Sequence, residues 1–226
     1  MNVDLLWDGP SPRTRGPKGA LTLDQIADAA IAVADAEGLA AVSMQRVAAD
    51  LGYTKMSLYR YLPGKAELIA VMVERGLGVP PDRAGGDWRV RLTAWCRAIR
   101  ERYAAHPWAV EATMRPRPVG PHEMAWMERA VSVLPAGLTG TERLDTVAVL
   151  ALHARTMAAQ AANAPQEAEF AAAIGAALTR HADRFPAVAA AMADAAGGDQ
   201  DQAFGYGIAR ILDGVEVLLR RRRAGG

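Results

Sequence analysis

The helical period governs this chain along most of its 226 residues. Apolar residues recur every three or four positions, alanine is abundant, and β-branched or aromatic residues never form alternating runs. Because a strand that buries one face needs a period of two, these patterns favour helices and exclude an extensive sheet. With 51% hydrophobic residues, the chain can build one large core or a small domain packed on a larger one. The sequence therefore predicts an all-α fold.

Composition excludes several classes of protein. The net charge is +1 and 23% of the residues are charged, so any contact with nucleic acid must be local. Cys96 is the only cysteine, which excludes an intrachain disulfide and a zinc site built from cysteines. Residues 1–10 lack the segments of a signal peptide, and charges interrupt every later apolar stretch. We therefore expect a cytoplasmic protein without a membrane partner.

The first 20 residues differ from the rest in composition. They are rich in proline and glycine and show little apolar periodicity, which predicts a flexible arm over residues 1–20. Its basic residues are Arg13, Arg15 and Lys18. Either a solvated tail or an arm that contacts DNA is compatible with this pattern.

Two helix signals follow the arm. Thr22 and Gln25 form the pattern of a capping box, and the helix that they begin ends at Gly38. Ser43 can cap a second amphipathic helix, which ends at Gly52. Glycine tolerates the positive φ of a tight turn, so we expect a sharp change of direction at Gly52.

A short helix directly after this turn carries the strongest functional signal. Thr54 can cap it, Pro63 ends it, and a fourth helix begins near Lys65 and runs toward Gly78. Two helices joined by a tight turn form a helix-turn-helix, whose second helix enters the major groove of DNA. All charged residues between Asp50 and Glu67 are basic, namely Lys55, Arg60 and Lys65. A locally basic helix in a neutral domain is typical of sequence-specific binding to double-stranded DNA.

This region contains SMQRVAADLGY at residues 43–53, SLYRYL at 57–62 and KAEL at 65–68. Together these strings resemble the tetracycline-repressor (TetR) family. The resemblance implies that Tyr59 and Lys65 contact phosphate, and that Tyr61 lies near the DNA backbone. It also implies that Lys55, Met56 and Ser57 contact bases. The predicted DNA-binding residues are Arg46, Thr54, Lys55, Met56, Ser57, Tyr59, Arg60, Tyr61 and Lys65.

Some of these residues have an alternative structural role. Leu58 falls on the face of Val47 and is expected in the core. Tyr61 can pack in the core as well as touch DNA, because tyrosine serves both purposes. Arg46 can contact phosphate or remain an exposed helix charge.

Pro80, Pro81, Gly85 and Gly86 form the clearest linker, although we expect the fourth helix to belong to both parts. Further helices are predicted at 87–105, 107–115, 121–134, 141–163, 165–183, 187–195 and 199–223. The predicted domains are an arm at 1–20, a three-helix helix-turn-helix domain at 21–66, and a larger helical ligand-binding and dimerisation domain at 67–226.

The helices at 141–163 and 199–223 are the predicted dimer surface. Helix-turn-helix proteins bind as two-fold dimers because one recognition helix spans too few bases for useful discrimination. The family dimerises through four such helices, so we expect the apolar faces of this pair in a homodimer interface, with the core of one chain as the alternative. The small residues Ala148, Ala151, Gly205 and Gly207 would permit close approach. The apolar faces comprise Val147, Leu150, Ala151, Ala154, Ala158, Phe204, Ile208, Ile211, Leu212, Val215 and Leu219.

Aromatic and sulfur-containing side chains gather between the linker and these helices. Such residues line adaptable apolar pockets, although each one taken singly is more often part of a core. We expect a small apolar or aromatic effector here, without a metal or another cofactor, and release of DNA through a shift of the fourth helix. The predicted pocket residues are Trp95, Tyr103, His106, Trp108, Met114, Trp126, Met127, His153 and Met157.

The sequence thus predicts a ligand-responsive transcriptional regulator, a repressor that binds a palindromic operator as a dimer. An activator, and a helical interaction module that does not bind DNA, remain alternatives. An enzyme is the least favoured class, because the four histidines form no H-E-x-x-H pair and neither a phosphate loop nor a G-x-S-x-G motif is present.

Overall fold

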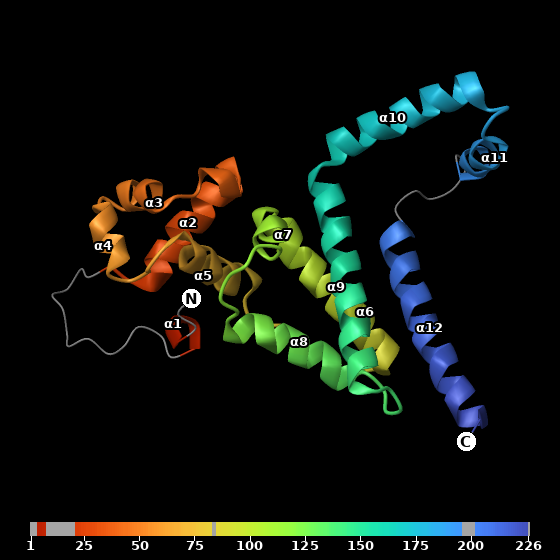
Figure 1. The fold of residues 1–226 in the computed structure, drawn as a ribbon, viewed down its shortest axis with the longest axis horizontal. Helices are drawn as coiled ribbons and strands as arrows, with labels where there is room; N and C mark the ends of the chain where they lie inside the picture. The colour runs from red at the N-terminus through yellow and green to blue at the C-terminus, as the bar shows by residue number, and fades with distance from the viewer. Residues whose placement is uncertain (1–3, 8–20, 83–84, 196–201, 226) are drawn as a thin grey trace.

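The computed structural model describes residues 4–7, 21–82, 85–195 and 202–225, and these ranges contain helices and loops but no strand. Figure 1 shows two lobes, with α2 to α5 in one and the remaining long helices in the other. The predicted all-α fold is confirmed. None of the described helices combines the length and the apolar composition that a membrane-spanning helix needs.

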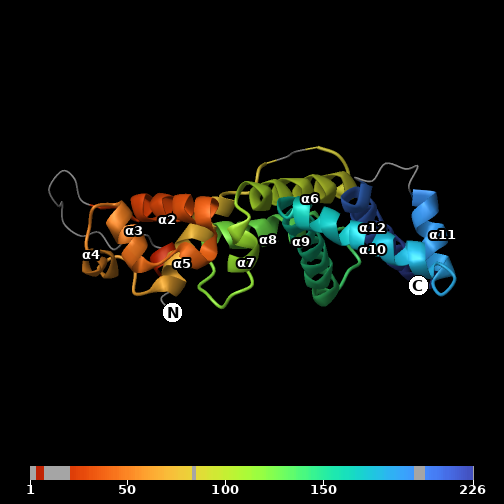
Figure 2. The ribbon, with the colours of Figure 1, turned by 90° about the horizontal axis from the view of Figure 1, so that it is seen from above.

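The N-terminal lobe is a small bundle. It contains α2 (Leu23–Glu37), α3 (Met44–Asp50), α4 (Lys55–Tyr59) and α5 (Lys65–Leu77), with the 3-10 turn η1 (Leu39–Ala41) after α2. Figure 2 shows α3 and α4 at the far end of the elongated molecule, away from the C-terminal lobe. The lobe therefore presents its helix-turn-helix where a long partner such as DNA has free access.

Local signals determine where these helices begin and end. The Thr22 hydroxyl accepts a hydrogen bond from the Gln25 amide at 3.1 Å, and the Gln25 side chain accepts one from the Thr22 amide at 2.9 Å. The Ser43 hydroxyl accepts one from the Arg46 amide at 3.1 Å. Gly52 has φ +73°, the conformation that favours glycine. The predicted capping box, the cap and the glycine turn are confirmed.

The C-terminal lobe is built around a long helix. It contains α6 (Trp88–Ala105), α7 (Trp108–Ala112), α8 (Pro121–Val133), α9 (Gly140–Ala162) and α12 (Ala203–Gly225). Helices α6 and α12 both pack against α9. In Figure 1, α12 runs alongside α9 and ends near the loop where α9 begins.

Helix α9 begins one residue earlier than the expected 141, because Thr139 and Glu142 form a second capping box. Helix α12 begins at Ala203 in the described residues, and residues 199–201 of the expected helix lie outside them. The difference in α9 concerns a helix end, where a local cap decides the first residue.

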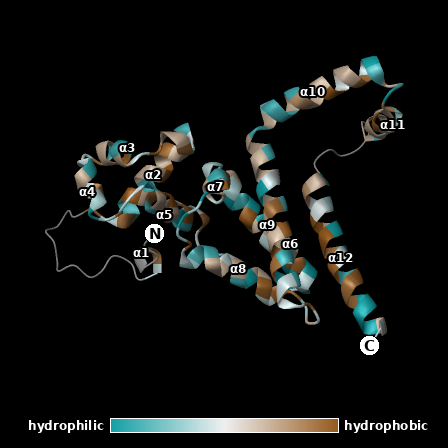
Figure 3. Cartoon of the chain, in the orientation of Figure 1, coloured by the Kyte–Doolittle hydropathy of each residue, from teal (hydrophilic) through white to brown (hydrophobic). Residues whose placement is uncertain are grey.

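Helices α10 (Ala164–His181) and α11 (Pro186–Ala195) form an arm that extends from the end of α9, as Figure 1 shows. Neither helix has a buried residue. Their exposed side chains nevertheless include Phe170 and Val188, and the segment between the two helices exposes Phe185. Figure 3 shows hydrophobic residues along α11 and along much of α12.

The predicted N-terminal arm is described only at α1 (Asp4–Trp7), a helical turn. Leu6 packs against the core, and the indole N–H of Trp7 donates a hydrogen bond to the Val119 carbonyl at 3.1 Å. The basic residues Arg13, Arg15 and Lys18 lie outside the described residues.

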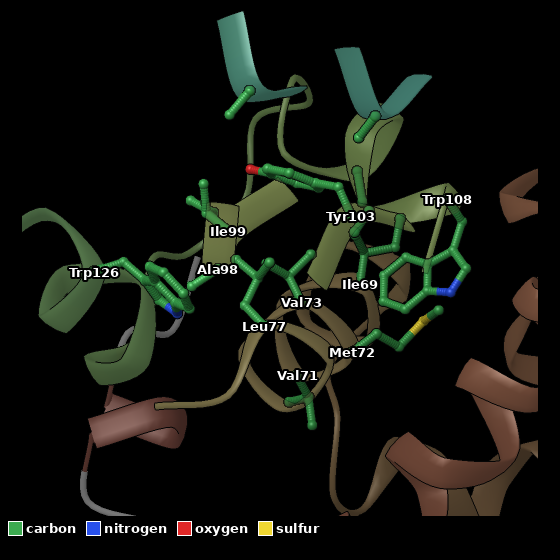
Figure 4. Close-up of a cluster of buried hydrophobic side chains, with 14 of the residues drawn as sticks. Ile69, Val71, Met72, Val73, Leu77, Ala98, Ile99, Tyr103, Trp108 and Trp126 are labelled. Carbon is green, nitrogen blue, oxygen red and sulfur yellow. The ribbon is translucent and has the colours of Figure 1, made fainter. Parts of the chain in front are cut away.

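Helix α5 belongs to both lobes. It packs against α2 on one side and against α6, α7 and α8 on the other, and most of its residues are buried. Figure 4 shows Met72, Val73 and Leu77 of this helix in one cluster with Trp108 and Trp126 of the C-terminal lobe. Because it packs against helices of both lobes, α5 connects the N-terminal lobe with the C-terminal lobe.

Candidate nucleic-acid interface

The turn between α3 and α4 is closed by backbone hydrogen bonds. The Gly52 amide donates to Ala49 at 3.0 Å, and the Tyr53 amide donates to Ala48 at 2.8 Å. Thr54 then adopts an extended conformation and caps α4. These bonds satisfy the last carbonyl groups of α3 and fix the direction in which α4 leaves the turn.

Helix α4 has one buried face and one exposed face. Leu58 is fully buried, as the sequence predicts, and anchors the helix to the core. Lys55, Met56, Tyr59 and Arg60 are exposed. A helix of five residues that is fixed by one leucine and exposes the rest of its surface is suited to insertion into a groove.

Two contacts orient the side chains of α4. The Thr54 and Ser57 hydroxyl oxygens lie 3.0 Å apart, and the Thr54 hydroxyl also accepts from the Ser57 amide at 3.3 Å. The ammonium group of Lys55 lies 5.5 Å from the ring centroid of Tyr59, within the range of a cation–π interaction. Lys55 and Tyr59 therefore occupy the same side of the helix.

Lys65 and Tyr61 lie beside this helix in different environments. Lys65 is the first residue of α5 and is exposed, so its ammonium group is free to reach phosphate near the positive end of that helix. Tyr61 is half-buried and packs against the core. This packing corresponds to one of the two roles expected for Tyr61, and its contact with DNA stays a prediction.

Arg46 is engaged within the chain. Its guanidinium donates to Glu37 at 2.8 Å and to Asp50 at 3.0 Å. The hydrogen bonds to Glu37 and Asp50 raise the pKa of Arg46, and the pairing with Arg46 lowers the pKa of Glu37. Arg46 thus joins α3 to the end of α2, and its predicted phosphate contact stays a prediction.

Two adjacent residues of α5, Glu74 and Arg75, contact different lobes. Arg75 forms ion pairs with Asp28 and Asp24 of α2, the latter at 3.0 Å. The preceding residue, Glu74, contacts the C-terminal lobe. One of its carboxylate oxygens accepts a hydrogen bond from the backbone amide of His122 at the start of α8. The other Glu74 oxygen is buried and has no hydrogen-bond partner among the residues that the structure describes. This pair of contacts makes α5 the mechanical link between the helix-turn-helix and the C-terminal lobe.

Asp35 forms a second link between the lobes. Its carboxylate accepts a hydrogen bond from the Trp108 indole at 2.7 Å and lies 2.9 Å from Nδ1 of His106. Asp35 belongs to α2, whereas His106 and Trp108 belong to the corner between α6 and α7. Gly76 leaves room for this corner, since a Cβ there would lie 3.3 Å from the Trp108 ring.

Sequence patterns could not identify Asp35 as a functional residue. It lies on an exposed face of α2, where an acid is common, and its partners are more than 70 residues away along the chain. The partners of Glu74 and Arg75 are also distant along the chain, at separations of 47 residues or more. Only the interspersed apolar residues of α5 indicated that the helix contacts both lobes.

The predicted pocket residues occupy different environments. The buried ones are packed tightly: the Trp95 indole donates to the Trp126 carbonyl at 3.0 Å, and the Trp126 indole donates to Gly78 at 2.9 Å. Burial raises the pKa of Tyr103. Trp95, Tyr103, Trp108 and Trp126 are buried, His106, His153 and Met157 are half-buried, and Met114 and Met127 are exposed.

A small hollow lies beside two of these tryptophans. It has a volume of about 20 Å³ and lies between α6 and α8, lined by Trp95, Trp126, Arg91 and Arg129 among others. This volume accommodates little more than a water molecule. The hollow is therefore too small for an aromatic molecule. Among the described residues, no cluster of three or more His, Cys, Asp or Glu side chains forms a possible metal site.

The prediction for the dimer faces of α9 and α12 requires a correction. Most of the apolar residues assigned to the interface, including Leu150, Ile208 and Leu212, are buried within the single chain. They pack against α6 and against one another, because a helix laid along a core buries its most continuous apolar stripe first. Other apolar side chains remain exposed on both helices, namely Leu144, Val149, Leu152, Tyr206 and Val217.

Gly207 also has a role different from the expected one. The His153 ring lies against it so closely that a Cβ there would overlap the ring, whereas Gly205 faces open space. Nε2 of His153 lies 3.0 Å from the Phe204 carbonyl, and the two rings stack at 5.7 Å. The close approach at Gly207 is therefore between α9 and α12 of the same chain.

Two family models match the chain. Residues 21–72 match the model described as bacterial regulatory proteins of the tetR family. Residues 80–219 match the model described as the tetracyclin repressor-like C-terminal domain. The first match covers the helix-turn-helix and most of α5, and the second covers nearly the whole C-terminal lobe.

Individual relatives agree with these matches. The HTH-type transcriptional repressor DrrR1 of Streptomyces coeruleorubidus is 39% identical, over 98% of this chain and 87% of that protein. The crystal structure of apo ActR from Streptomyces coelicolor is 27% identical, has a TM-score of 0.74, and covers 88% of this chain and 96% of that chain. ActR in complex with actinorhodin has the same identity and a TM-score of 0.78, with 89% of this chain and 98% of that chain covered.

Proposed function

The chain belongs to the TetR family of bacterial transcriptional regulators, and on this basis we propose that it represses transcription by binding operator DNA. It binds the operator as a homodimer and releases it when a small apolar or aromatic molecule enters the C-terminal lobe. This role is regulatory, not enzymatic, and it places the protein with the chromosome in the cytoplasm. The exposed face of α4 is the observation that carries the proposal.

The DNA contacts follow from the geometry of the helix-turn-helix. Helix α4 enters the major groove with its exposed face, while Leu58 keeps it attached to the core. The positive end of α5 and the ammonium group of Lys65 lie beside it and favour phosphate. The proposed base contacts come from Lys55, Met56 and Ser57, the phosphate contacts from Tyr59 and Lys65, and the flanking positions are Arg46, Thr54, Arg60 and Tyr61.

The homodimer is supported by apolar surface that one chain leaves exposed. Leu144, Leu152 and Val217 project from α9 and α12 although their neighbours on these helices are buried. The arm of α10 and α11 adds Phe170 and Val188 to the same end of the molecule. Removal of such surface from water is the main driving force of association, and it is favourable for symmetric dimers.

The effector class is supported by a structural relative. The ActR structure contains actinorhodin, and its fold matches that of this chain with a TM-score of 0.78. Here the tryptophans between α6 and α8 offer aromatic surface once they separate. Movement of α8 acts on Glu74, and movement of the corner between α6 and α7 acts on Asp35. Both routes displace the helix-turn-helix and change the distance between the two α4 helices of the dimer.

Selection of duplexes from a random pool tests the DNA function. The full-length protein is expected to enrich a palindrome whose half-sites are about one helical turn apart. Actinorhodin is the first effector probe, and it is expected to lower the affinity for the selected duplex. Enrichment of no sequence contradicts the proposal of operator binding. Tight binding of actinorhodin without any change in operator affinity contradicts the proposed release.

A further inference from the structure

Met56 is the most exposed large hydrophobic side chain among the described residues, with 71% of its surface accessible. It lies in the second position of α4, on the side away from the buried Leu58. Other large apolar residues of the N-terminal lobe, such as Ile26, Leu58 and Leu62, are fully buried. Exposure of an apolar side chain to water is unfavourable, so a partner that covers Met56 gains hydrophobic free energy.

The neighbours of Met56 have other partners. Thr54 and Ser57 bind each other through their hydroxyl groups, and Lys55 lies over the ring of Tyr59. Tyr59 and Arg60 carry polar ends that suit phosphate or base edges. Met56 is therefore the only exposed side chain of α4 that offers apolar contact at its tip.

The major groove contains one apolar group with which Met56 can pair. Each base pair presents hydrogen-bond donors and acceptors there, and only the C5-methyl group of thymine is apolar. The thioether of methionine is a weak acceptor, so polar base edges gain little from it. Its flexible chain adapts to an irregular surface and covers a methyl group well.

Building on the proposed operator binding, we infer that Met56 is a specificity-determining residue that selects a pyrimidine C5-methyl group, that of thymine, in each half-site. Removal of one such methyl from water corresponds to about a fourfold change in affinity per half-site, or about fifteenfold for a symmetric operator. The proposed phosphate contacts of Tyr59 and Lys65 contribute affinity for any sequence, whereas Met56 makes the protein sensitive to one methyl group.

The test replaces single thymines of the selected operator by uracil, in both half-sites at once. Uracil pairs as thymine does and lacks only the methyl group. For the wild-type chain, one position is expected to show a loss of about fifteenfold, and Met56→Ala is expected to reduce the ratio of thymine to uracil affinity at that position to about one. Met124→Ala on α8 is the matched control, since Met124 is also exposed, and it should retain the full ratio.

A second pair of duplexes distinguishes the effect of the methyl group from that of the rest of the base. With 5-methylcytosine and cytosine compared at the same position, the methyl group should again increase the affinity for the wild type and not for Met56→Ala. The inference is overturned if the ratio of thymine to uracil affinity is near one at every thymine for the wild type. It is also overturned if Met56→Ala keeps the wild-type ratio. Operator binding stands in both cases. A selected half-site without thymine also overturns it. Failure to select any duplex overturns the proposed function and this inference together.

Discussion

The two ends of the molecule differ in the burial of their apolar side chains. The N-terminal lobe buries Ile26, Leu58 and Leu62 completely, although its helices are short. The arm of α10 and α11 has no buried residue, although α10 is longer than any helix of that lobe. The comparison shows that the DNA-binding end is folded by contacts within one chain, whereas the far end of the C-terminal lobe leaves its apolar side chains exposed.

Removal of a core side chain from the N-terminal lobe has the largest expected effect. Leu58→Ala deletes the only anchor of α4, and the cavity and lost transfer energy cost about 2–5 kcal/mol of unfolding free energy. Urea unfolding measures this loss. Phe170→Ala on the exposed arm is the control, and in dilute protein it should change the unfolding free energy by less than about 0.5 kcal/mol. Equal costs at the two sites would remove the contrast between the two ends.

The contact at Gly207 gives the next largest effect. Gly207→Ala forces the added methyl group against the His153 ring, and such overpacking costs about 1–3 kcal/mol. Gly205→Ala lies on the same helix and faces open space, so the gain in helix propensity should leave the chain as stable or slightly more stable. Thermal unfolding of both variants tests the difference. A loss at Gly205 as large as that at Gly207 contradicts the packing of α9 against α12 described here.

Local features of the N-terminal lobe were predictable from its sequence. Thr22, Ser43 and Thr54 are caps whose hydrogen-bond partners lie three residues away. Gly52 has the positive φ that its position between two helices requires. Such signals involve neighbours in the chain, so the sequence determines them without knowledge of the tertiary fold.

The contacts of the C-terminal lobe were not predictable in the same way. Periodicity identified apolar stripes on α9 and α12 but not which element covers them, and Leu150 and Leu212 proved to be buried within the chain. The contact of Asp35 with His106 and Trp108 depends on how the two lobes meet. A hydrophobic period indicates that a face is buried and does not identify its partner.

The link between the lobes predicts a smaller effect. Trp108→Phe keeps an aromatic ring and removes the N–H that binds Asp35, a hydrogen bond to a charged group whose loss changes coupling by about 1–3 kcal/mol. Operator affinity without effector should stay within about threefold of the wild type, and the release caused by actinorhodin should weaken. Trp88→Phe, at a half-buried tryptophan, is the control. Unchanged release in Trp108→Phe would contradict a coupling role for Asp35.

The ion pair at the end of the bundle gives the smallest effect. Hydrogen bonds from Arg222 lower the pKa of Glu142 from 4.5 to about 2. Because the folded state favours the charged form, the stabilisation is fully present above pH 4.5 and is lost as the pH falls toward 2. Glu142→Gln should be less stable than the wild type near neutral pH, and urea midpoints should converge below about pH 2. A stability difference between Glu142→Gln and the wild type that persists at this low pH would contradict the ion pair with Arg222 as its cause.

The DNA affinity of a variant with Tyr59→Ala and Lys65→Ala tests the central claim most directly. Fluorescence anisotropy with the selected duplex, at two salt concentrations, compares this variant with the wild type after circular dichroism has shown equal helix content. The expected result is an affinity loss of at least about a hundredfold and a salt dependence weaker by about two counterions per dimer. An unchanged affinity and salt dependence would contradict DNA binding through the exposed face of α4.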